Sequence, residues 1–276
     1  MISAFRMLLT VALVVSGGLP LAAAPEAVEF QGRAKYHKKT VTLSGELFRP
    51  EGAGPFPAVV LMHGCAGLSP PVHDGLRAHA EYLTQHGFVA LILDSFGPRK
   101  NAGGWVCKTY GRLGAARRYR TTDALDAGRF LQAQDFVDAD NIFQVGQSNG
   151  GSVSIRLAQF VEPVFRAIAA YYPWCGAFNG LGNNATLTSP LIVFGGEADD
   201  WVPPQKCKTV VASGTDYKVI VYPDAAHSFD LNIKLQKYQG HLVGYNRPAT
   251  LDSRRQMVAF FRKHFTAALK SRAPAQ

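Results

Sequence analysis

Gly146-Gln147-Ser148-Asn149-Gly150-Gly151 is the stretch of sequence that decides the fold. It follows a short strand pattern at 142–145 and precedes a helix-like stretch at 152–160. A G-x-S-x-G pattern between a strand and a helix is typical of the nucleophile elbow, a sharp turn that exposes a serine hydroxyl at a helix N-terminus. Small residues are needed there because the strained chain passes close to its neighbours. The stretch therefore predicts that Ser148 is a nucleophile.

Strand and helix patterns alternate on both sides of this turn. Apolar or alternating runs predict strands at 41–48, 58–62, 88–93, 142–145, 167–172, 191–194 and 218–222, and amphipathic patterns predict helices at 76–86, 121–133, 152–160, 203–212 and 250–269. This alternation indicates an α/β fold with a mainly parallel central sheet and helices on both faces. Because only a short loop separates the strands at 167–172 and 191–194, we expect no large cap domain over the site.

Candidates for a base and an acid follow two of the predicted strands. A serine hydroxyl is a poor nucleophile unless a base takes its proton, and in this fold the chain order is serine, acid, histidine. Asp199 follows the strand at 191–194, and His227 follows the strand at 218–222. Because open α/β sheets build their sites at the carboxyl edge of the strands, we expect Ser148, Asp199 and His227 to form a catalytic triad.

Two other acidic residues, Glu197 and Asp200, compete with Asp199 for the supporting role. The position three residues past Gly196 favours Asp199 as the residue that faces the histidine. Asp200 is then a turn or surface residue, or it caps the helix expected from Pro203 onward.

Two backbone N–H groups are expected to stabilise an oxyanion. Asn149, directly after the nucleophile, should donate one. The loop His63-Gly64-Cys65-Ala66-Gly67 follows the strand at 58–62, and we expect Cys65 to donate the other. His63 is expected to brace this loop by hydrogen bonds. Cys65 lacks the elbow that a nucleophile needs.

Three further residues are candidates for contacts with a substrate. Trp105 and Trp174 could form walls of the pocket, although packing within the protein accounts for them equally well. Arg99 could meet an anionic group of a substrate, with a structural salt bridge as the alternative.

The N-terminus has the features of an export signal. Arg6 precedes a short apolar run, and small residues follow at 19–24. We expect residues 1–24 to be a signal peptide, residues 25–276 to form a single domain, and the protein to be periplasmic or secreted. An uncleaved membrane anchor is the alternative, but the run is short and no later stretch could span a bilayer.

Four cysteines, Cys65, Cys107, Cys175 and Cys207, remain in the mature chain. Such an even number in an exported protein permits two disulfides, and spacing alone does not choose among the three pairings. No metal site is expected, because no two cysteines stand in a Cys-x-x-Cys arrangement.

The formal net charge is +9, and part of it lies in two basic clusters. Arg33, Lys35, Lys38 and Lys39 form the first cluster, and Arg112, Arg117, Arg118 and Arg120 form the second. Basic faces can attract nucleic acid or anionic substrates. Because neither cluster carries a nucleic-acid-binding motif, we expect both to be solvated surface and no nucleic-acid partner.

Taken together, these segments resemble the dienelactone hydrolase family, especially its exported members. The resemblance rests on PAVVLMHGCAGL at 57–68, DSFGPR at 94–99, GQSNGG at 146–151, YPWCG at 172–176, GEADDWVP at 196–203 and YPDAAHSFD at 222–230. It implies an α/β-hydrolase fold without a cap and without a cofactor, in which Ser148, Asp199 and His227 form the triad. It also suggests disulfides between Cys65 and Cys107 and between Cys175 and Cys207.

The chain departs from the family at the nucleophile. The namesake enzymes use cysteine, whereas this chain has Ser148. The departure favours hydrolysis of carboxylic esters in general, with lactones as a further possibility, through an acyl-enzyme. A peptidase or amidase on the same triad is the alternative within enzymes. A non-catalytic exported protein that holds polyanions is the alternative outside them.

Overall fold

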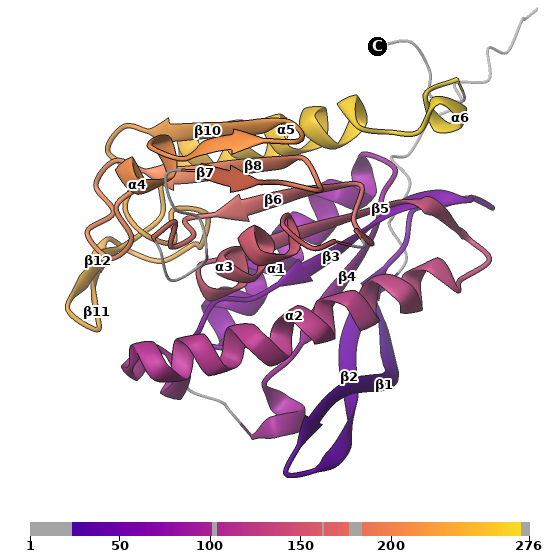
Figure 1. The fold of residues 1–276 in the computed structure, drawn as a ribbon, viewed down its shortest axis with the longest axis horizontal. Helices are drawn as coiled ribbons and strands as arrows, with labels where there is room; N and C mark the ends of the chain where they lie inside the picture. The colour runs from indigo at the N-terminus through magenta and orange to yellow at the C-terminus, as the bar shows by residue number, and fades with distance from the viewer. Residues whose placement is uncertain (1–23, 101–103, 162, 177–183, 272–276) are drawn as a thin grey trace, which may run out of the picture.

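An eight-stranded sheet forms the centre of the protein (Figure 1). The computed structural model describes residues 24–100, 104–161, 163–176 and 184–271. The predicted signal peptide at 1–24 lies outside the described residues except for its last position. The strands of the sheet are β1 (Glu26–Tyr36), β2 (Lys39–Phe48), β3 (Phe56–Met62), β4 (Val89–Asp94), β5 (Val137–Gln147), β6 (Ala167–Tyr171), β8 (Leu191–Gly196) and β10 (Tyr217–Tyr222).

The strand order is β1-β2-β4-β3-β5-β6-β8-β10. The β1–β2 and β2–β4 pairs are antiparallel, and all later neighbours are parallel. The fold therefore has the mainly parallel central sheet that the sequence predicts. The carboxyl ends of β5, β8 and β10 lie at the same edge, where the candidate triad residues follow them.

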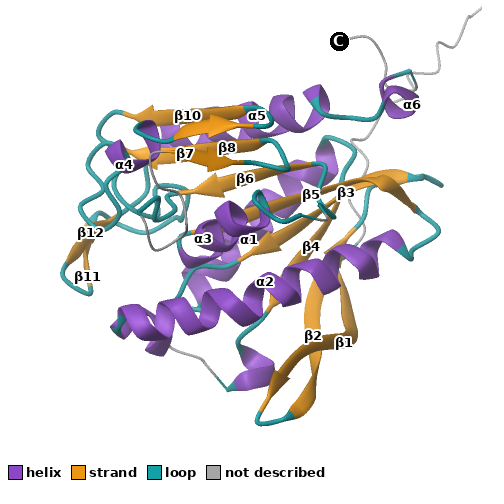
Figure 2. Ribbon diagram, viewed as in Figure 1, coloured by secondary structure: helices purple, strands orange, loops and turns teal. Residues whose placement is uncertain are grey.

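Helices cover both faces of this sheet (Figure 2). The longer helices are α1 (Pro70–Gln85), α2 (Tyr110–Gln132), α3 (Asn149–Leu157) and α5 (Arg247–Lys263). Alternate residues of β3 divide between two apolar cores. Val60 joins a core with α2 and α3, whereas Val59 and Leu61 join a core with α1 and α5. This division explains why the run at 58–62 is apolar without alternation, since both faces of the strand are buried.

Several short elements complete the described fold. They are α4 (Gln205–Lys208), α6 (Ala267–Lys270), the 3₁₀ turns at Gly97–Arg99 and Trp105–Lys108, the paired strands β7 (Asn184–Thr186) and β9 (Val211–Ser213), and the hairpin of β11 (Gln236–Tyr238) and β12 (His241–Val243). In the described part of the chain, the β11–β12 hairpin and neighbouring loops lie at the carboxyl edge of the sheet, and no helical domain is inserted there.

Three expected helices differ from those observed. The helix expected at 203–212 is a single turn, α4, after which the chain extends into β9. The helix expected at 121–133 begins at Tyr110, because the Thr109 side chain caps it by accepting a hydrogen bond from the Arg112 amide. The last expected helix divides into α5 and α6, and the Thr266 side chain caps the second by accepting from the Leu269 amide.

Two disulfides tie loops at the carboxyl edge to neighbouring segments. Cys65 is bonded to Cys107, and Cys175 is bonded to Cys207, the pairs that the resemblance suggests. Disulfides persist in oxidising environments and are rare in the reducing cytosol, so they indicate an oxidising compartment. In the part of the chain that is described, no helix has the length and apolar character needed to cross a membrane.

The bond between Cys175 and Cys207 should contribute to stability, because it restricts the unfolded chain across a sequence separation of 32 residues. We expect the double variant Cys175→Ser/Cys207→Ser to lose about 2–4 kcal/mol of unfolding free energy in urea under non-reducing conditions. Wild-type protein treated with a thiol reductant is the control and should lose more, since both bonds then open. Equal stability of variant and wild type would contradict the assignment.

Candidate active site

Ser148 lies at the sharp turn between β5 and α3. Its backbone takes φ 52° and ψ −111°, outside the regions that side-chain-bearing residues ordinarily adopt. The turn is held by a hydrogen bond from the Ser148 amide to the Tyr171 carbonyl oxygen, 2.9 Å away on the neighbouring strand. A strained conformation of this kind persists only when its surroundings fix it, and such conformations cluster at functional sites.

The glycines of the turn are required by close packing. A Cβ at Gly146 would collide with the carbonyl oxygen of Gly150. A Cβ at Gly150 would lie 2.6 Å from the Met62 carbonyl oxygen, closer than real contacts allow. The G-x-S-x-G pattern therefore reflects the close approach of β5, α3 and the end of β3.

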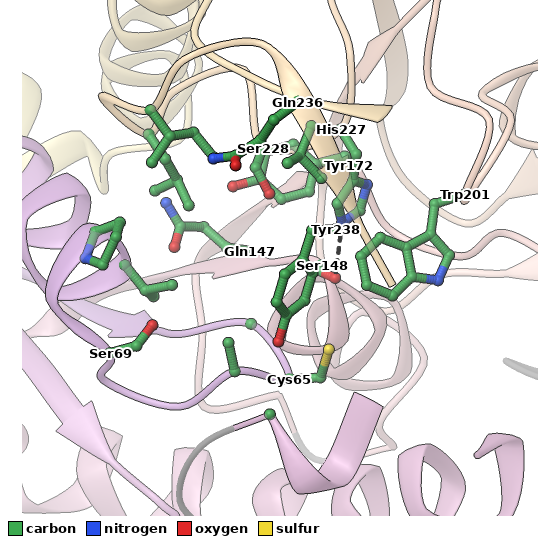
Figure 3. A pocket seen from close by; sticks show the side chains of 18 residues that line it. Cys65, Ser69, Gln147, Ser148, Tyr172, Trp201, His227, Ser228, Gln236 and Tyr238 are labelled. Atoms are coloured by element: carbon green, nitrogen blue, oxygen red, sulfur yellow. Dashed lines mark hydrogen bonds between the residues drawn. The ribbon is translucent and has the colours of Figure 1, made fainter. Parts of the chain in front are cut away.

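His227 connects Ser148 to Asp199. Figure 3 shows the His227 ring beside the Ser148 hydroxyl. Its Nε2 lies 3.0 Å from Ser148 Oγ, and its Nδ1 lies 2.7 Å from Asp199 Oδ2. Because a carboxylate can only accept, Nδ1 carries the proton and Nε2 is free to accept from the serine hydroxyl. Both His227 and Asp199 are almost fully buried. The three side chains thus have the geometry that serine hydrolases need.

Asp199 is held by its own turn, and its two acidic neighbours point elsewhere. Its Oδ1 accepts hydrogen bonds from the amides of Trp201 and Val202, each 2.9 Å long. Asp200 is exposed and accepts from the Leu242 amide at 2.8 Å, so it fastens the β11–β12 hairpin. Glu197 is exposed. Asp199, the residue three positions past Gly196, is thus the acidic residue that meets His227.

The backbone and the ring of His227 are fixed from several sides. The His227 amide donates to the Leu242 carbonyl oxygen, and its own carbonyl accepts from the Gly244 amide, so β12 runs beside it. The ring packs edge-on against Tyr172, with centroids 4.6 Å apart, and lies 5.0 Å from the Trp201 ring. These contacts fix the imidazole orientation that the hydrogen bonds require.

The two expected oxyanion donors both lie beside Ser148. Asn149 is the first residue of α3, and amides in the first turn of a helix have no acceptor within it. Cys65 follows Gly64, where an added Cβ would lie 3.3 Å from Ser148 Cβ. Cys65 also lines the same cavities as Ser148 and His227. A helix N-terminus and a glycine-containing loop therefore converge on the hydroxyl.

His63 is buried, and its Nδ1 donates a hydrogen bond of 2.7 Å to the Gly64 carbonyl oxygen. Burial, together with the charge of Arg120, holds the pKa of His63 well below its ordinary value. The ring is therefore neutral at physiological pH and braces the loop, as its sequence position led us to expect.

Two cavities meet at Ser148. The larger, of about 340 Å³, is lined mostly by apolar side chains that include Val72, Leu231, Ile233 and Val243, and Tyr238 of the hairpin also lines it (Figure 3). The smaller, of about 60 Å³, is bounded by Tyr110, Leu113 and Trp174. Among the described residues that line them, there is no lysine, arginine, aspartate or glutamate. These cavities suit apolar, uncharged groups on both sides of the hydroxyl.

The structure corrects two of the expected substrate contacts. Arg99 is 1% exposed, and its guanidinium forms two hydrogen bonds of 2.8 Å with Asp123, so it is not accessible to a substrate. The structural salt bridge is the correct alternative. Trp105 is exposed, stacks beneath the Arg112 guanidinium at 3.9 Å and lines neither cavity. Trp174 does line the smaller cavity.

A buried polar network beneath the site was missed in the sequence. Asp230 Oδ2 accepts from His79 and from Gln147, each at 2.7 Å, and Oδ1 accepts from the Tyr172 hydroxyl at 2.6 Å. Asp230 thus fixes Gln147, which precedes Ser148, and Tyr172, whose ring packs against His227. Asp230 appears in the sequence as the last residue of the YPDAAHSFD segment, but nothing in that segment identifies the residues that bond to it.

The network also fixes protonation states. Burial alone would raise the pKa of Asp230, but hydrogen bonds from His79, Tyr172 and Gln147 outweigh it and lower that pKa. Burial, and then the charge of Arg254, lower the pKa of His79. A neutral imidazole therefore donates to an ionised carboxylate, and both groups are buried.

Comparisons with known proteins agree with this fold. The model of the dienelactone hydrolase family matches residues 43–265. An uncharacterized protein of Mycobacterium tuberculosis (strain H37Rv) is 26% identical over 206 residues, which cover 67% of this chain and 68% of that protein.

Two solved structures are similar in fold. A proposed dienelactone hydrolase from Klebsiella pneumoniae has a TM-score of 0.63 at 17% identity, with 87% of this chain and 99% of that chain covered. An esterase from Thermogutta terrifontis has a TM-score of 0.59 at 16% identity, with 85% and 91% covered. At these identities the structures establish the shared fold.

The buried imidazoles predict that acid destabilises the protein. Because the folded-state pKa values of His63 and His79 are lowered, the unfolded chain takes up protons near pH 6.5 before the folded chain does. Unfolding free energy should therefore fall as the pH drops from 7 to 5, by up to about 1.4 kcal/mol per pH unit for each imidazole.

Urea unfolding at several pH values measures this slope. His79→Gln should make it shallower, because glutamine takes up no proton. His37→Gln, at an exposed position in the β1–β2 turn, is the matched control and should leave the slope unchanged. A slope that is identical in all three proteins would contradict the role of His79.

Proposed function

The chain belongs to the dienelactone hydrolase family, and on that premise we propose that it is a serine hydrolase that cleaves uncharged carboxylic esters through an acyl-enzyme. Membership makes it a hydrolase that acts on ester bonds. The observation that carries the finer proposal is the pair of hydrogen bonds at His227, 3.0 Å to Ser148 Oγ and 2.7 Å to Asp199 Oδ2. Together they provide a nucleophile, a base in the correct tautomer and an acid that stabilises the protonated base.

In the first half of the reaction, Ser148 Oγ forms a bond to the ester carbonyl carbon while its proton passes to His227 Nε2. The carbonyl oxygen becomes an oxyanion, which the N–H groups of Cys65 and Asn149 stabilise. Asp199 stabilises the imidazolium that forms. The tetrahedral intermediate then collapses, the bond to the alcohol oxygen breaks, and the alcohol leaves with the proton from Nε2.

In the second half, water replaces the alcohol. His227 Nε2 takes a proton from the water as its oxygen attacks the acyl carbon, and the same N–H groups stabilise the second oxyanion. Collapse breaks the bond to Ser148 Oγ, which recovers its proton from His227. The carboxylic acid leaves, and the enzyme returns to its starting state.

The cavities support an uncharged substrate. The larger one offers an apolar surface from Val72, Leu231 and Ile233, and the described residues that line it include no lysine or arginine to pair with an anion. Burying an unpaired charge there would cost several kcal/mol or more. We assign the acyl chain to this cavity and the leaving group to the smaller one beside Trp174. Lactones remain within this substrate class when they are uncharged.

Location in the periplasm or outside the cell is part of the proposal. It is supported by the two disulfides and by the signal-like pattern at 1–24. We propose that residues 25–276 fold as a single exported domain.

The nucleophile is tested with Ser148→Ala. We expect kcat for short-chain p-nitrophenyl esters to fall by about 10⁴-fold or more, because the acyl-enzyme is proposed to form on the Ser148 hydroxyl. A fluorophosphonate should label the wild type once, as measured by intact mass, and should not label the variant. Ser213→Ala, at an exposed position on β9, is the control and should react like the wild type.

Labelling that persists in Ser148→Ala would place the nucleophile elsewhere. Matched p-nitroanilides separate the rival activity: faster cleavage of the amide than of the ester would favour a peptidase. The polyanion-binding alternative predicts no labelling at all and binding that weakens steeply with salt.

The acyl cavity is tested with esters of increasing length. In the wild type, kcat/KM should rise by up to about fourfold per added methylene until the cavity is filled, because each buried methylene contributes about 0.8 kcal/mol. Ile233→Trp should reduce the ratio of hexanoate to acetate hydrolysis by about tenfold or more. Leu235→Trp, on the same loop but exposed, is the matched control.

Two results would contradict the assignment of this cavity. One is faster hydrolysis of a hemisuccinate ester than of the butyrate ester, because the anion would then be preferred. The other is an equal loss of acetate and hexanoate hydrolysis in Ile233→Trp.

A further inference from the structure

Arg120 is a fully buried arginine at the back of the candidate active site. It belongs to the second basic cluster, which we expected to be solvated surface, yet it is 0% exposed, and Arg117 of the same cluster is also buried. That expectation is therefore wrong for these two residues. Arg120 lies on α2, which packs against α3, β3 and β5. Ser148 stands between β5 and α3.

The Arg120 guanidinium connects two segments that are distant in sequence. Its Nη1 donates a hydrogen bond of 2.7 Å to Asn149 Oδ1, and its Nη2 donates one of 2.6 Å to the His63 carbonyl oxygen. Asn149 follows β5, and His63 follows β3. These strands are paired in register, with Met62 beside Gly146. One planar side chain thus joins the two loops that leave adjacent strands.

The same two loops supply the proposed oxyanion donors. The amide of Asn149 is one donor, and the amide of Cys65, two residues after His63, is the other. The Asn149 side chain is held from a second side as well, because its Nδ2 donates to the Leu113 carbonyl oxygen of α2 at 3.2 Å. Helix α2 therefore fixes Asn149 at two points.

The charge of Arg120 has no direct counter-ion. None of the ion pairs among the described residues includes it, and the nearby carboxylate of Asp123 is engaged by Arg99. Burial lowers the pKa of Arg120 to about 10, with Asp123 and Asp94 among the groups that oppose this change. The side chain therefore stays protonated at neutral pH. A buried cation without a carboxylate partner is costly, so its presence beside the candidate active site points to a function.

We propose that Arg120 is the positioning residue of the oxyanion hole, which holds the loop of Cys65 and the turn of Asn149 at the spacing that a tetrahedral oxyanion requires. This inference rests on the proposed function. Arg120 does not touch the substrate. Its guanidinium fork fixes both donors before the reaction, and its charge favours the negative charge that develops in a site of low dielectric constant.

A positioning role for Arg120 and a merely structural role predict different effects on kcat and on ligand binding. Donors aimed at the oxyanion stabilise the transition state more than the bound ester, so their misplacement lowers kcat and leaves KM nearly unchanged. Loss of one oxyanion donor typically lowers the rate by about 10²–10³-fold. A general loosening of the fold would instead weaken the binding of every ligand.

The experiment compares Arg120→Met and Arg120→Lys with the wild type. For p-nitrophenyl butyrate, we expect Arg120→Met to lower kcat by about 10²-fold or more with KM changed less than about threefold. Arg120→Lys keeps the charge but lacks the two-armed fork, so its kcat should lie between those of Arg120→Met and the wild type.

A trifluoromethyl ketone inhibitor provides the decisive readout. Ser148 adds to its carbonyl and forms a stable oxyanion in the hole, whereas the corresponding alcohol occupies the site without one. Arg120→Met should weaken inhibition by the ketone by about 10²-fold and inhibition by the alcohol by less than about threefold. An equal weakening of both inhibitors would overturn the proposal in favour of a structural role.

Two further variants keep the proposal falsifiable if Arg120→Met does not fold. Asn149→Ala removes one acceptor of the guanidinium and keeps the backbone donor, so we expect kcat to fall by about tenfold or more with the same selectivity for the ketone. Asn141→Ala breaks the part-buried hydrogen bond to Thr266 from the middle of β5 and is the stability control, with kcat unchanged.

The outcomes separate this inference from the proposed function. A wild type that neither hydrolyses esters nor binds the ketone would remove the proposed function itself. An active wild type whose Arg120→Lys and Asn149→Ala variants keep kcat within threefold and bind the ketone equally well would overturn the inference alone.

Discussion

The strained turn at Ser148 is the constraint on which the rest of the site depends. It directs Oγ toward His227 and also starts α3 at Asn149, so one backbone conformation places the proposed nucleophile and a proposed oxyanion donor together. The conformation persists because Gly146 and Gly150 let neighbouring segments approach where a Cβ would collide. The turn follows β5, a strand paired on both sides in the middle of the sheet, which gives the turn a rigid base.

Buried polar groups then fix the segments around this turn. Asp230 accepts hydrogen bonds from α1, from the end of β5 and from the residue after β6. Arg120 donates hydrogen bonds to the loop after β3 and to the start of α3. Each group is removed from water, and several hydrogen bonds offset the cost of that removal. Apolar packing could hold the same elements together, but it would not fix orientation so closely. The site therefore depends on directional contacts between residues that are far apart in sequence.

Local patterns in the sequence predicted the parallel strands of the sheet and the positions of the candidate triad, because short buried strands are apolar and their carboxyl ends share an edge. They did not predict β1, which lies at the sheet edge and carries charged residues between its apolar ones. They also missed the first half of α2, whose arginines gave it a polar character. The sequence could not tell that Arg120 is buried while Arg118 of the same cluster is exposed, since burial is decided by segments distant along the chain.

The distribution of charge is the last feature that these contacts explain. The chain carries a net charge of +9, yet the described residues lining the two cavities include no lysine or arginine, and a guanidinium lies instead behind the loop and the turn beside Ser148. A cation within the cavity would attract anionic ligands equally before and during reaction, which lowers KM without accelerating the chemical step. A cation behind the backbone amides acts chiefly when negative charge appears on the carbonyl oxygen. In the role proposed for it, Arg120 therefore favours the transition state over the ground state.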